Sequence, residues 1–130
     1  MSAPTRRAPS VLVVEDRASI RCLLEELLAQ DGLRVRAAAT TQEALEALDA
    51  TTPDLVLVDL LLPGGCGDAL VQTLRSRPAT STTPVIVVSG LDGAELISRE
   101  LGVQEFVPKP FDVRHLLERI HFHLAAVSTS

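Results

Sequence analysis

Residues 55–59 read Leu-Val-Leu-Val-Asp, and residues 60–65 continue as Leu-Leu-Leu-Pro-Gly-Gly. Four uninterrupted aliphatic residues after the turn-forming pair Pro53-Asp54 are typical of a strand covered on both faces, as in a parallel sheet. Asp59 then falls at the carboxyl end of that strand. Ligands of open α/β sheets bind in the crevice at this end. Asp59 taken alone is equally consistent with a helix cap or an ion-pair partner, so its role depends on its neighbours.

The rest of the chain alternates between strand patterns and helical patterns. Further strands are expected at residues 10–14, 33–38, 85–88 and 105–108. Apolar spacings of three and four predict helices at 18–30, after a cap at Thr40 or Thr41, from Gly67-Asp68 to before Pro78, from 92 to about 101, and from a cap at Asp112 to Leu124. Strand and helix alternate five times, which predicts an α/β fold. We expect a flavodoxin-like three-layer (βα)5 architecture with a five-stranded parallel sheet in the order 2-1-3-4-5.

Length and composition indicate one domain. The 130 residues are 46% hydrophobic but only 2% aromatic, so the core is built from Leu, Val, Ile and Ala. We expect residues 10–125 to form the domain. Residues 1–9 hold two prolines and small polar residues and are expected to be a disordered lead-in, and residues 126–130 a flexible tail.

Charge and hydropathy exclude several classes of partner and location. The net charge of −5 argues against direct nucleic-acid binding, because phosphate backbones require surfaces rich in Lys and Arg. No apolar run is long enough to span a bilayer, and the first residues lack a signal-peptide pattern. Cys22 and Cys66 form no paired motif, so a reducing, cytoplasmic location is expected.

The predicted topology gathers reactive side chains in one crevice. The carboxyl ends of the strands carry Glu15, Asp16, Asp59, Ser89 and Lys109. Three close carboxylates repel one another unless a cation is bound, and oxygen ligands of this kind suit Mg²⁺. A carboxylate can also act as a nucleophile toward phosphorus. The phosphoryl group then needs positive charge and hydrogen-bond donors, which Lys109, the only lysine among 12 basic residues, and Ser89 would supply.

The order of four short motifs resembles the receiver domain of two-component response regulators. The resemblance covers residues 10 to about 125 and rests on four segments: Val13-Val14-Glu15-Asp16, Leu57-Val58-Asp59 followed by Leu62-Pro63-Gly64, Val87-Val88-Ser89-Gly90, and Pro108-Lys109-Pro110-Phe111. Each motif alone is weak evidence, whereas all four in order and at fitting separations are strong evidence.

The resemblance implies a phosphoacceptor and a set of metal ligands. Asp59 corresponds to the phosphoacceptor, and Asp16 and Asp59 to side-chain ligands of Mg²⁺ or Mn²⁺. Glu15 would act through a water molecule, and Leu61 would offer its backbone carbonyl.

The resemblance also implies a phosphoryl clamp and a switch. Ser89 and Lys109 correspond to the hydroxyl and the ammonium that hold the phosphoryl group. The Lys109–Pro110 bond is expected to be cis, because the cis isomer of a peptide bond has a small free-energy cost only before proline. Ser89 and Phe106 correspond to the pair that rearranges on activation.

The implied function is that of a stand-alone phosphoacceptor response regulator. A sensor histidine kinase or a histidine phosphotransfer protein would donate the phosphoryl group, and altered protein–protein contacts of a monomer or a weak phosphorylation-dependent dimer would carry the signal. No enzymatic activity is expected beyond self-catalysed phosphotransfer and autodephosphorylation. The alternatives are a receiver-like interaction module without phosphorylation and a receiver fragment of a longer regulator or hybrid kinase. A phosphoester hydrolase is disfavoured, because that class places a second Asp where this chain has Leu61.

One departure from the family pattern bears on output, and another on access to the phosphoryl group. The stretch from Ser89 to Lys109 is shorter than usual, so the helix within it is expected to be short or its leading loop tight. Gly90 is expected to leave the space beside Ser89 open.

Overall fold

The computed structural model describes residues 8–63 and 65–128 of the chain. Its centre is a parallel five-stranded sheet in the order β2-β1-β3-β6-β7. The bounds of these strands are β1 (Ser10–Val14), β2 (Arg34–Ala38), β3 (Leu55–Val58), β6 (Val85–Ser89) and β7 (Glu105–Pro108). Numbered along the chain as the five strands of this sheet, the order is 2-1-3-4-5, so the predicted fold is confirmed.

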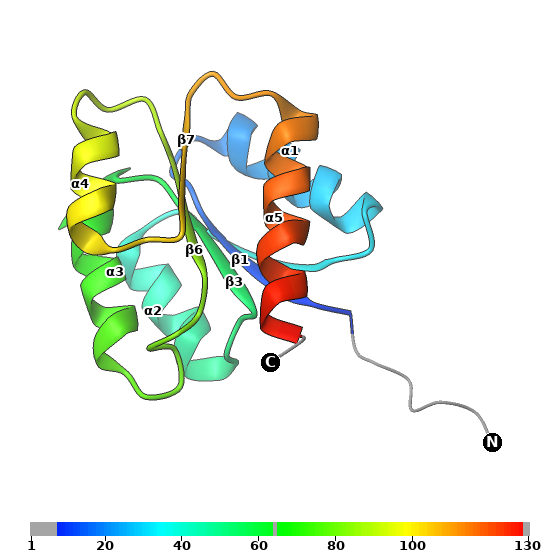
Figure 1. Cartoon of the computed structure of the whole chain (residues 1–130), viewed down its shortest axis with the longest axis horizontal. Coiled ribbons are helices and arrows are strands. Elements are labelled where there is room, and N and C mark those ends of the chain that lie inside the picture. Colours follow the sequence, from blue (N-terminus) through cyan, green and yellow to red (C-terminus); the bar gives the residue numbers. More distant parts are fainter. Residues whose placement is uncertain (1–7, 64, 129–130) are drawn as a thin grey trace.

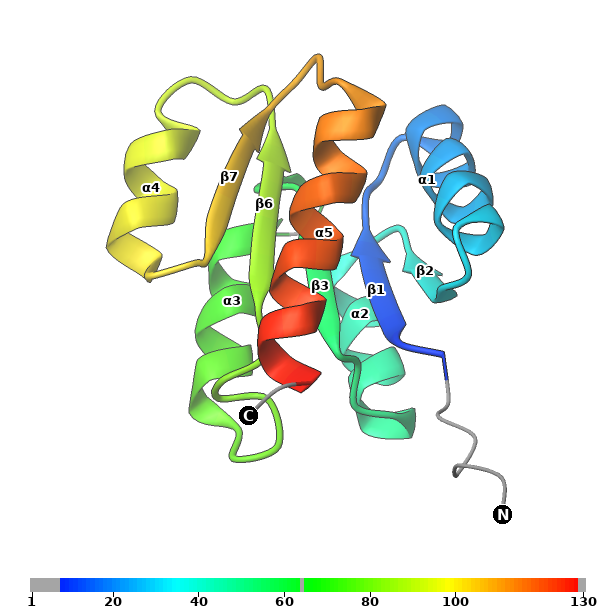
Figure 2. The same cartoon turned by 45° about the vertical axis from the view of Figure 1, so that its right-hand side comes forward.

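Helices cover both faces of the sheet, with α1 and α5 on one face and α2, α3 and α4 on the other (Figures 1 and 2). Their bounds are α1 (Ala18–Gln30), α2 (Thr41–Ala50), α3 (Gly67–Ser76), α4 (Ala94–Leu101) and α5 (Val113–Ser128). The helix α4 has 8 residues, in keeping with the short stretch between Ser89 and Lys109. No helix of the described residues is long and apolar enough to cross a membrane.

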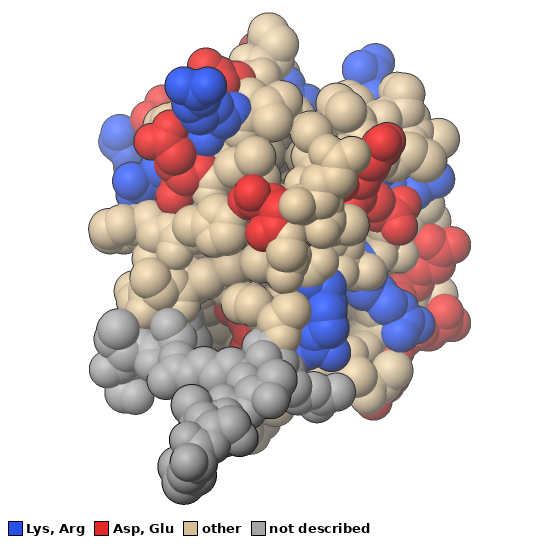
Figure 3. Space-filling model, turned by 90° about the vertical axis from the view of Figure 1, so that its right-hand side faces the viewer, with Lys and Arg blue, Asp and Glu red and all other residues tan. Residues whose placement is uncertain are grey.

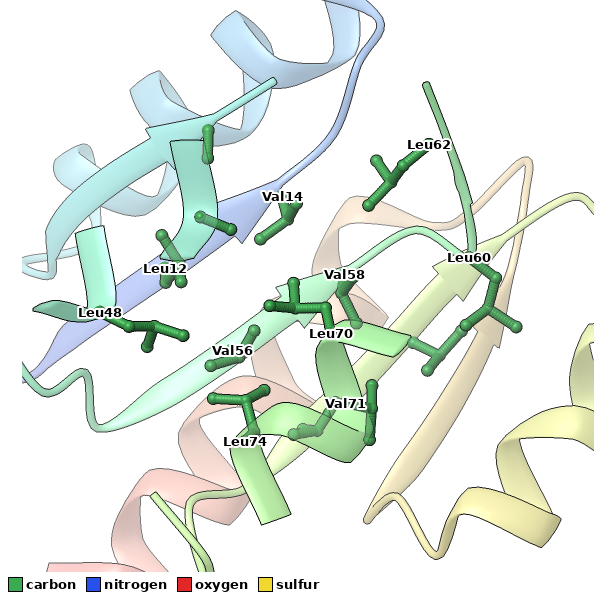
Figure 4. Packing of buried hydrophobic residues seen from close by; sticks show 14 of the residues in the cluster. Leu12, Val14, Leu48, Val56, Val58, Leu60, Leu62, Leu70, Val71 and Leu74 are labelled. Atoms are coloured by element: carbon green, nitrogen blue, oxygen red, sulfur yellow. The ribbon is translucent and has the colours of Figure 1, made fainter. Parts of the chain in front are cut away.

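Two hydrophobic cores lie on opposite faces of the sheet. Neighbouring strand residues point in opposite directions, so Val11 and Val13 join the core beneath α1 and α5, while Leu12 and Val14 join the core beneath α2 and α3. Figure 4 shows the second core, where Leu70 of α3 lies among the side chains of β1 and β3. Burial on both faces explains why β1, β3 and β6 are almost wholly apolar.

The helix termini refine the sequence-based boundaries. Thr40, rather than Thr41, caps α2, because its hydroxyl accepts a hydrogen bond from the Glu43 N–H. The helix α4 starts at Ala94 rather than at residue 92. Gly93 precedes it with a φ of 82°, a left-handed conformation that ends the preceding turn.

The last helix is longer than predicted. We expected a flexible tail from residue 126, but α5 continues through Ser128. The segment Ala125-Ala126-Val127 contains neither Gly nor Pro, so nothing in its sequence breaks the helix. The remaining predicted tail, residues 129–130, and most of the predicted lead-in, residues 1–7, lie outside the described residues.

A short antiparallel hairpin, β4 (Leu61–Leu62) with β5 (Gly65–Cys66), follows β3 and was not predicted. It occupies the loop between Asp59 and α3, directly beside the carboxyl end of β3. The backbone N–H of Gly67 donates to the Leu60 carbonyl at 2.8 Å and closes this loop.

The surface formed by α1 and α5 carries both signs of charge. Figure 3 shows this side, where acidic and basic side chains lie next to one another in several places, with uncharged surface between these places. Leu23 of α1 and Phe122 of α5 are among the exposed large hydrophobic residues of the chain. The visible part of this side is therefore not the uniformly basic surface that a phosphate backbone would require.

Candidate functional site

The predicted site residues meet at the carboxyl ends of the strands. Glu15 follows β1, Asp59 follows β3, Ser89 ends β6 and Lys109 follows β7. The side chains differ in exposure: Glu15, Asp59 and Ser89 are buried, with residue exposures of 3%, 6% and 1%, whereas Asp16 is exposed. The parallel topology therefore brings together residues that lie up to 94 positions apart in the sequence.

Lys109 bridges the two buried carboxylates. Its Nζ donates to Glu15 Oε1 at 2.5 Å and to Asp59 Oδ2 at 2.7 Å. Burial by itself lowers the pKa of Lys109, but the hydrogen bonds and the charges of Asp59 and Glu15 outweigh it and raise that pKa above its ordinary value of 10.5. Lys109 is therefore firmly protonated at neutral pH and supplies a fixed positive charge to the crevice.

Backbone N–H groups hold the other oxygens of these carboxylates. Leu61 N–H donates to Asp59 Oδ1 at 3.0 Å, and Arg17 N–H donates to Glu15 Oε2 at 3.0 Å. Gly67 packs against the backbone at Asp59, where a Cβ would lie only 2.4 Å from the Asp59 carbonyl oxygen. The absence of a side chain at residue 67 is thus required for the close approach of the loop to β3.

The three carboxylates form a group of suitable size for a metal ion. Ligand oxygens of Glu15, Asp16 and Asp59 all lie within 4.8 Å of one another. Carboxylate oxygens are hard ligands that suit Mg²⁺, which retains several of its waters in such sites. Asp16 is exposed and so offers its oxygens on the solvent side of the group. The donor set therefore fits the predicted ion.

Ser89 and Lys109 are adjacent through their backbones. The Lys109 N–H donates to the Ser89 carbonyl at 3.1 Å, and the Lys109–Pro110 peptide bond is cis. The Ser89 hydroxyl accepts a hydrogen bond from Leu91 N–H at 3.2 Å. A Cβ on Gly90 would lie 3.6 Å from the Lys109 Cβ, an ordinary contact, so the space beside Ser89 holds no tight contact at this position.

Phe106 lies in β7, facing α4. It is half-buried and pairs in register with Val87, two residues before Ser89 on the neighbouring strand. It lines a groove of about 260 Å³ together with residues of α4, including Glu95, and with Glu105. The structure therefore connects the crevice to an exposed groove through two adjacent strands.

One residue of the site was not predicted. Arg21 of α1 donates from Nη1 to the Glu15 carbonyl at 3.0 Å and to the Asp16 carbonyl at 3.1 Å. A basic residue one helical turn beyond the start of a helix that follows two acidic residues was the available signal. That signal is weak, because exposed arginines are common at such positions.

The comparison with protein families agrees with the geometry. The family model described as response regulator receiver domain matches residues 11–121. The chain is 37% identical over 113 residues to the sensory transduction protein RegX3 of Mycobacterium bovis, which covers 85% of this chain and 48% of RegX3. RegX3 of Mycolicibacterium smegmatis is 36% identical over the same shares of both chains. The chain thus spans about half the length of these curated relatives.

Solved structures of response regulators and receiver domains have similar folds. A putative response regulator from Chloroflexus aurantiacus has a TM-score of 0.85 and 32% identity, covering 91% of this chain and 98% of that one. The non-phosphorylated HemR receiver domain from Leptospira biflexa has a TM-score of 0.81 and 34% identity, covering 89% of this chain and 94% of that one. The chain therefore belongs to the response regulator receiver domain family of two-component signalling.

Proposed function

We propose that the chain is a phosphoacceptor that takes a phosphoryl group from a phosphohistidine onto Asp59. The observation that carries the proposal is the environment of this carboxylate. Asp59 is buried at the carboxyl end of β3, with Lys109 on one oxygen and the Leu61 N–H on the other. The carboxylates of Glu15 and Asp16 lie beside it. A nucleophile, a cation and a group of metal ligands therefore share one crevice.

The proposed reaction is a transfer between two side chains. An oxygen of Asp59 forms a bond to phosphorus while the bond between phosphorus and the imidazole nitrogen of the donor breaks. The electron pair stays with the imidazole, which then takes a proton. The Lys109 ammonium, already hydrogen-bonded to Asp59, then pairs with the equatorial oxygens of the phosphoryl group, and the Ser89 hydroxyl donates to one of them.

The proposed metal site uses Asp16, Asp59, the Leu61 carbonyl and, through water, Glu15. When bound, Mg²⁺ or Mn²⁺ supplies charge neutralisation and orientation for the phosphoryl oxygens. Asp16 sits on the exposed side of the group, where an ion can enter from solvent. Glu15 already uses one oxygen for Lys109 and one for the Arg17 N–H, which fits an indirect role through water.

The proposed output is a change in protein contacts. An acyl phosphate at Asp59 carries up to about two negative charges, about one more than the carboxylate it replaces, and the Ser89 hydroxyl can turn from the Leu91 N–H to donate to it. Phe106 lies on the adjacent strand and borders the groove beside α4, so a rearrangement at Ser89 reaches an exposed surface over a short path. We propose a sensor histidine kinase or a histidine phosphotransfer protein as donor and a cytoplasmic location.

Mass spectrometry of the acetyl phosphate-treated protein tests the proposal. With Mg²⁺ present, the wild type should gain about 80 Da, the mass of one phosphoryl group, on the peptide that contains Asp59. Omission of Mg²⁺ should reduce the yield. The matched control is Asp54→Asn, which removes an exposed carboxylate before the same strand. Labelling of Asp59→Asn at wild-type yield would refute Asp59 as the acceptor.

A receiver-like interaction module that is never phosphorylated would give a different result in a binding assay. Such a protein would bind its partner equally well before and after acetyl phosphate treatment, and Asp59→Asn would leave that binding unchanged. The buried carboxylates and their lysine favour the phosphoacceptor, because a purely structural site gains little from a buried ion pair relative to apolar residues of similar size.

A further inference from the structure

Arg21 donates hydrogen bonds to the backbone of two proposed metal-site residues, and within the described residues it makes none to their carboxylates. It lies on α1, half-buried, and its Nη1 donates to the carbonyls of Glu15 and Asp16. One nitrogen therefore clamps two successive peptide groups of the turn that joins β1 to α1. A hydrogen bond from a charged donor contributes more than one from a neutral donor, about 1.5–3 kcal/mol in general.

Asp16 depends on this turn more than the other two carboxylates do. The Glu15 carboxylate is held by Lys109 and by the Arg17 N–H, and the Asp59 carboxylate by Lys109 and the Leu61 N–H. No hydrogen bond or ion pair to the Asp16 carboxylate exists among the described residues, and the residue is exposed. The position of its oxygens therefore follows from the backbone that carries it.

We propose that Arg21 is a positioning residue for the metal ligand Asp16. It acts through the Glu15 and Asp16 carbonyls, holding the turn so that the Asp16 oxygens face those of Glu15 and Asp59. The inference rests on the proposed metal-dependent function. Positioning and charge have opposite effects here, because a guanidinium near three carboxylates by itself repels a divalent cation. The sign of the change on mutation therefore separates the two roles.

The first test is a Mg²⁺ titration followed by backbone amide chemical shifts. Arg21→Met should weaken Mg²⁺ binding by about tenfold, the lower end of the range for residues that support metal ligands. Arg21→Lys, which keeps a charged donor, should bind Mg²⁺ more tightly than Arg21→Met. Charge alone predicts the reverse order. Wild-type or tighter binding by Arg21→Met would overturn the proposal.

Arg17→Met is the matched control for loss of charge. Arg17 is exposed next to the same acidic pair, and its guanidinium makes no hydrogen bond or ion pair within the described residues. Its replacement should leave Mg²⁺ affinity unchanged or slightly raised. Weakening equal to that of Arg21→Met would show that the clamp is not the cause. Should Arg21→Met fail to fold, Arg21→Gln replaces it in the comparison with Arg21→Lys, with the same order expected.

Phosphorylation kinetics supply the second readout. In Arg21→Met the Mg²⁺ concentration for half-maximal labelling by acetyl phosphate should rise, while the rate at saturating Mg²⁺ stays near that of the wild type. A loss confined to the saturated rate would contradict a positioning role. Failure of the wild type to bind Mg²⁺ would instead refute the proposed function, so the two failures are distinguishable.

Discussion

Replacement of Lys109 by methionine tests the electrostatics of the crevice most directly. The substitution keeps a flexible side chain of similar length but removes the ammonium that bridges Glu15 and Asp59. Two carboxylates then face each other with side-chain exposures of only 4% and 8%. Without a divalent ion, the folded variant must either hold two buried negative charges together or protonate one of them.

The size of the effect follows from the cheaper of these two alternatives. Removing one partner from a buried ion pair generally costs about 3–5 kcal/mol. Protonating one carboxyl group with an ordinary pKa near 4 at pH 7 costs about 4 kcal/mol, at 1.36 kcal/mol per pKa unit, and this sets an upper limit. The crevice is open to water beside the exposed Asp16, which lessens the repulsion. We therefore expect Lys109→Met to lower the free energy of unfolding by roughly 3 kcal/mol at pH 7.

Urea denaturation in the presence of a chelator, followed by far-ultraviolet circular dichroism, is the appropriate assay, because the chain has no Trp or Tyr to report by fluorescence. The matched control is Arg99→Met. This residue pairs with Glu95 at 3.5 Å, with side chains 75% and 65% exposed. An exposed pair of this kind contributes less than about 1 kcal/mol, so the control should be nearly neutral.

The pH dependence has a definite sign. In Lys109→Met, a proton bound by either carboxylate removes the repulsion between Glu15 and Asp59 in the folded state. The destabilisation should therefore be largest at pH 7, shrink as the pH falls toward 5, and vanish below the unfolded carboxyl pKa of about 4. Mg²⁺ should also stabilise the variant more than the wild type. A loss below about 1 kcal/mol, or an equal loss at pH 5 and pH 7, would refute the reasoning.

Two further predictions concern the supports of the site. Gly67→Ala should destabilise the fold by more than about 2 kcal/mol, because its Cβ would meet the backbone at 2.4 Å, whereas Gly90→Ala, with 3.6 Å of space, should change stability by less than about 0.5 kcal/mol in the same denaturation assay. Burial raises the pKa of Glu105, but its bonds to His123 and Arg119 outweigh burial and lower it below 4.5. The ionised form of Glu105 therefore adds stability above pH 4.5, and this stability is lost as the pH falls through the lowered pKa of Glu105. Glu105→Gln should flatten this part of an acid denaturation curve. An unchanged curve would show that the pairing of Glu105 with His123 and Arg119 adds no stability.

The local sequence was sufficient to predict the strands and the sheet order. Runs such as residues 55–58 and 85–88 are apolar on both faces, and only a strand between two helical layers buries both. Helices between all five strands require right-handed crossovers, which leave few sheet orders. Once the strands are parallel, their carboxyl ends share one edge. The grouping of Glu15, Asp59 and Lys109 was therefore predictable from their positions in the sequence.

Contacts that depend on side-chain reach were decided only by the tertiary structure. The bridge from Lys109 to Glu15 joins residues 94 positions apart, and its geometry depends on the exact separation of β1, β3 and β7. The clamp of Arg21 on two carbonyls likewise depends on how α1 lies against the end of β1. The sequence signals at Lys109 and Arg21 do not say which atoms these side chains contact, because each contact depends on one side chain in one rotamer.

The ends of helices and strands also divide into features that the sequence predicts and features that only the tertiary structure decides. Capping residues such as Asp112 could be predicted from the sequence, because the capping side chain accepts hydrogen bonds from N–H groups two or three positions away. The hairpin of β4 and β5 was not, since its pairing depends on where Gly67 packs beneath Asp59. Local hydrogen bonding and apolar periodicity are encoded within a few residues and can be predicted directly. Contacts across the sheet depend on packing that the whole chain must form together.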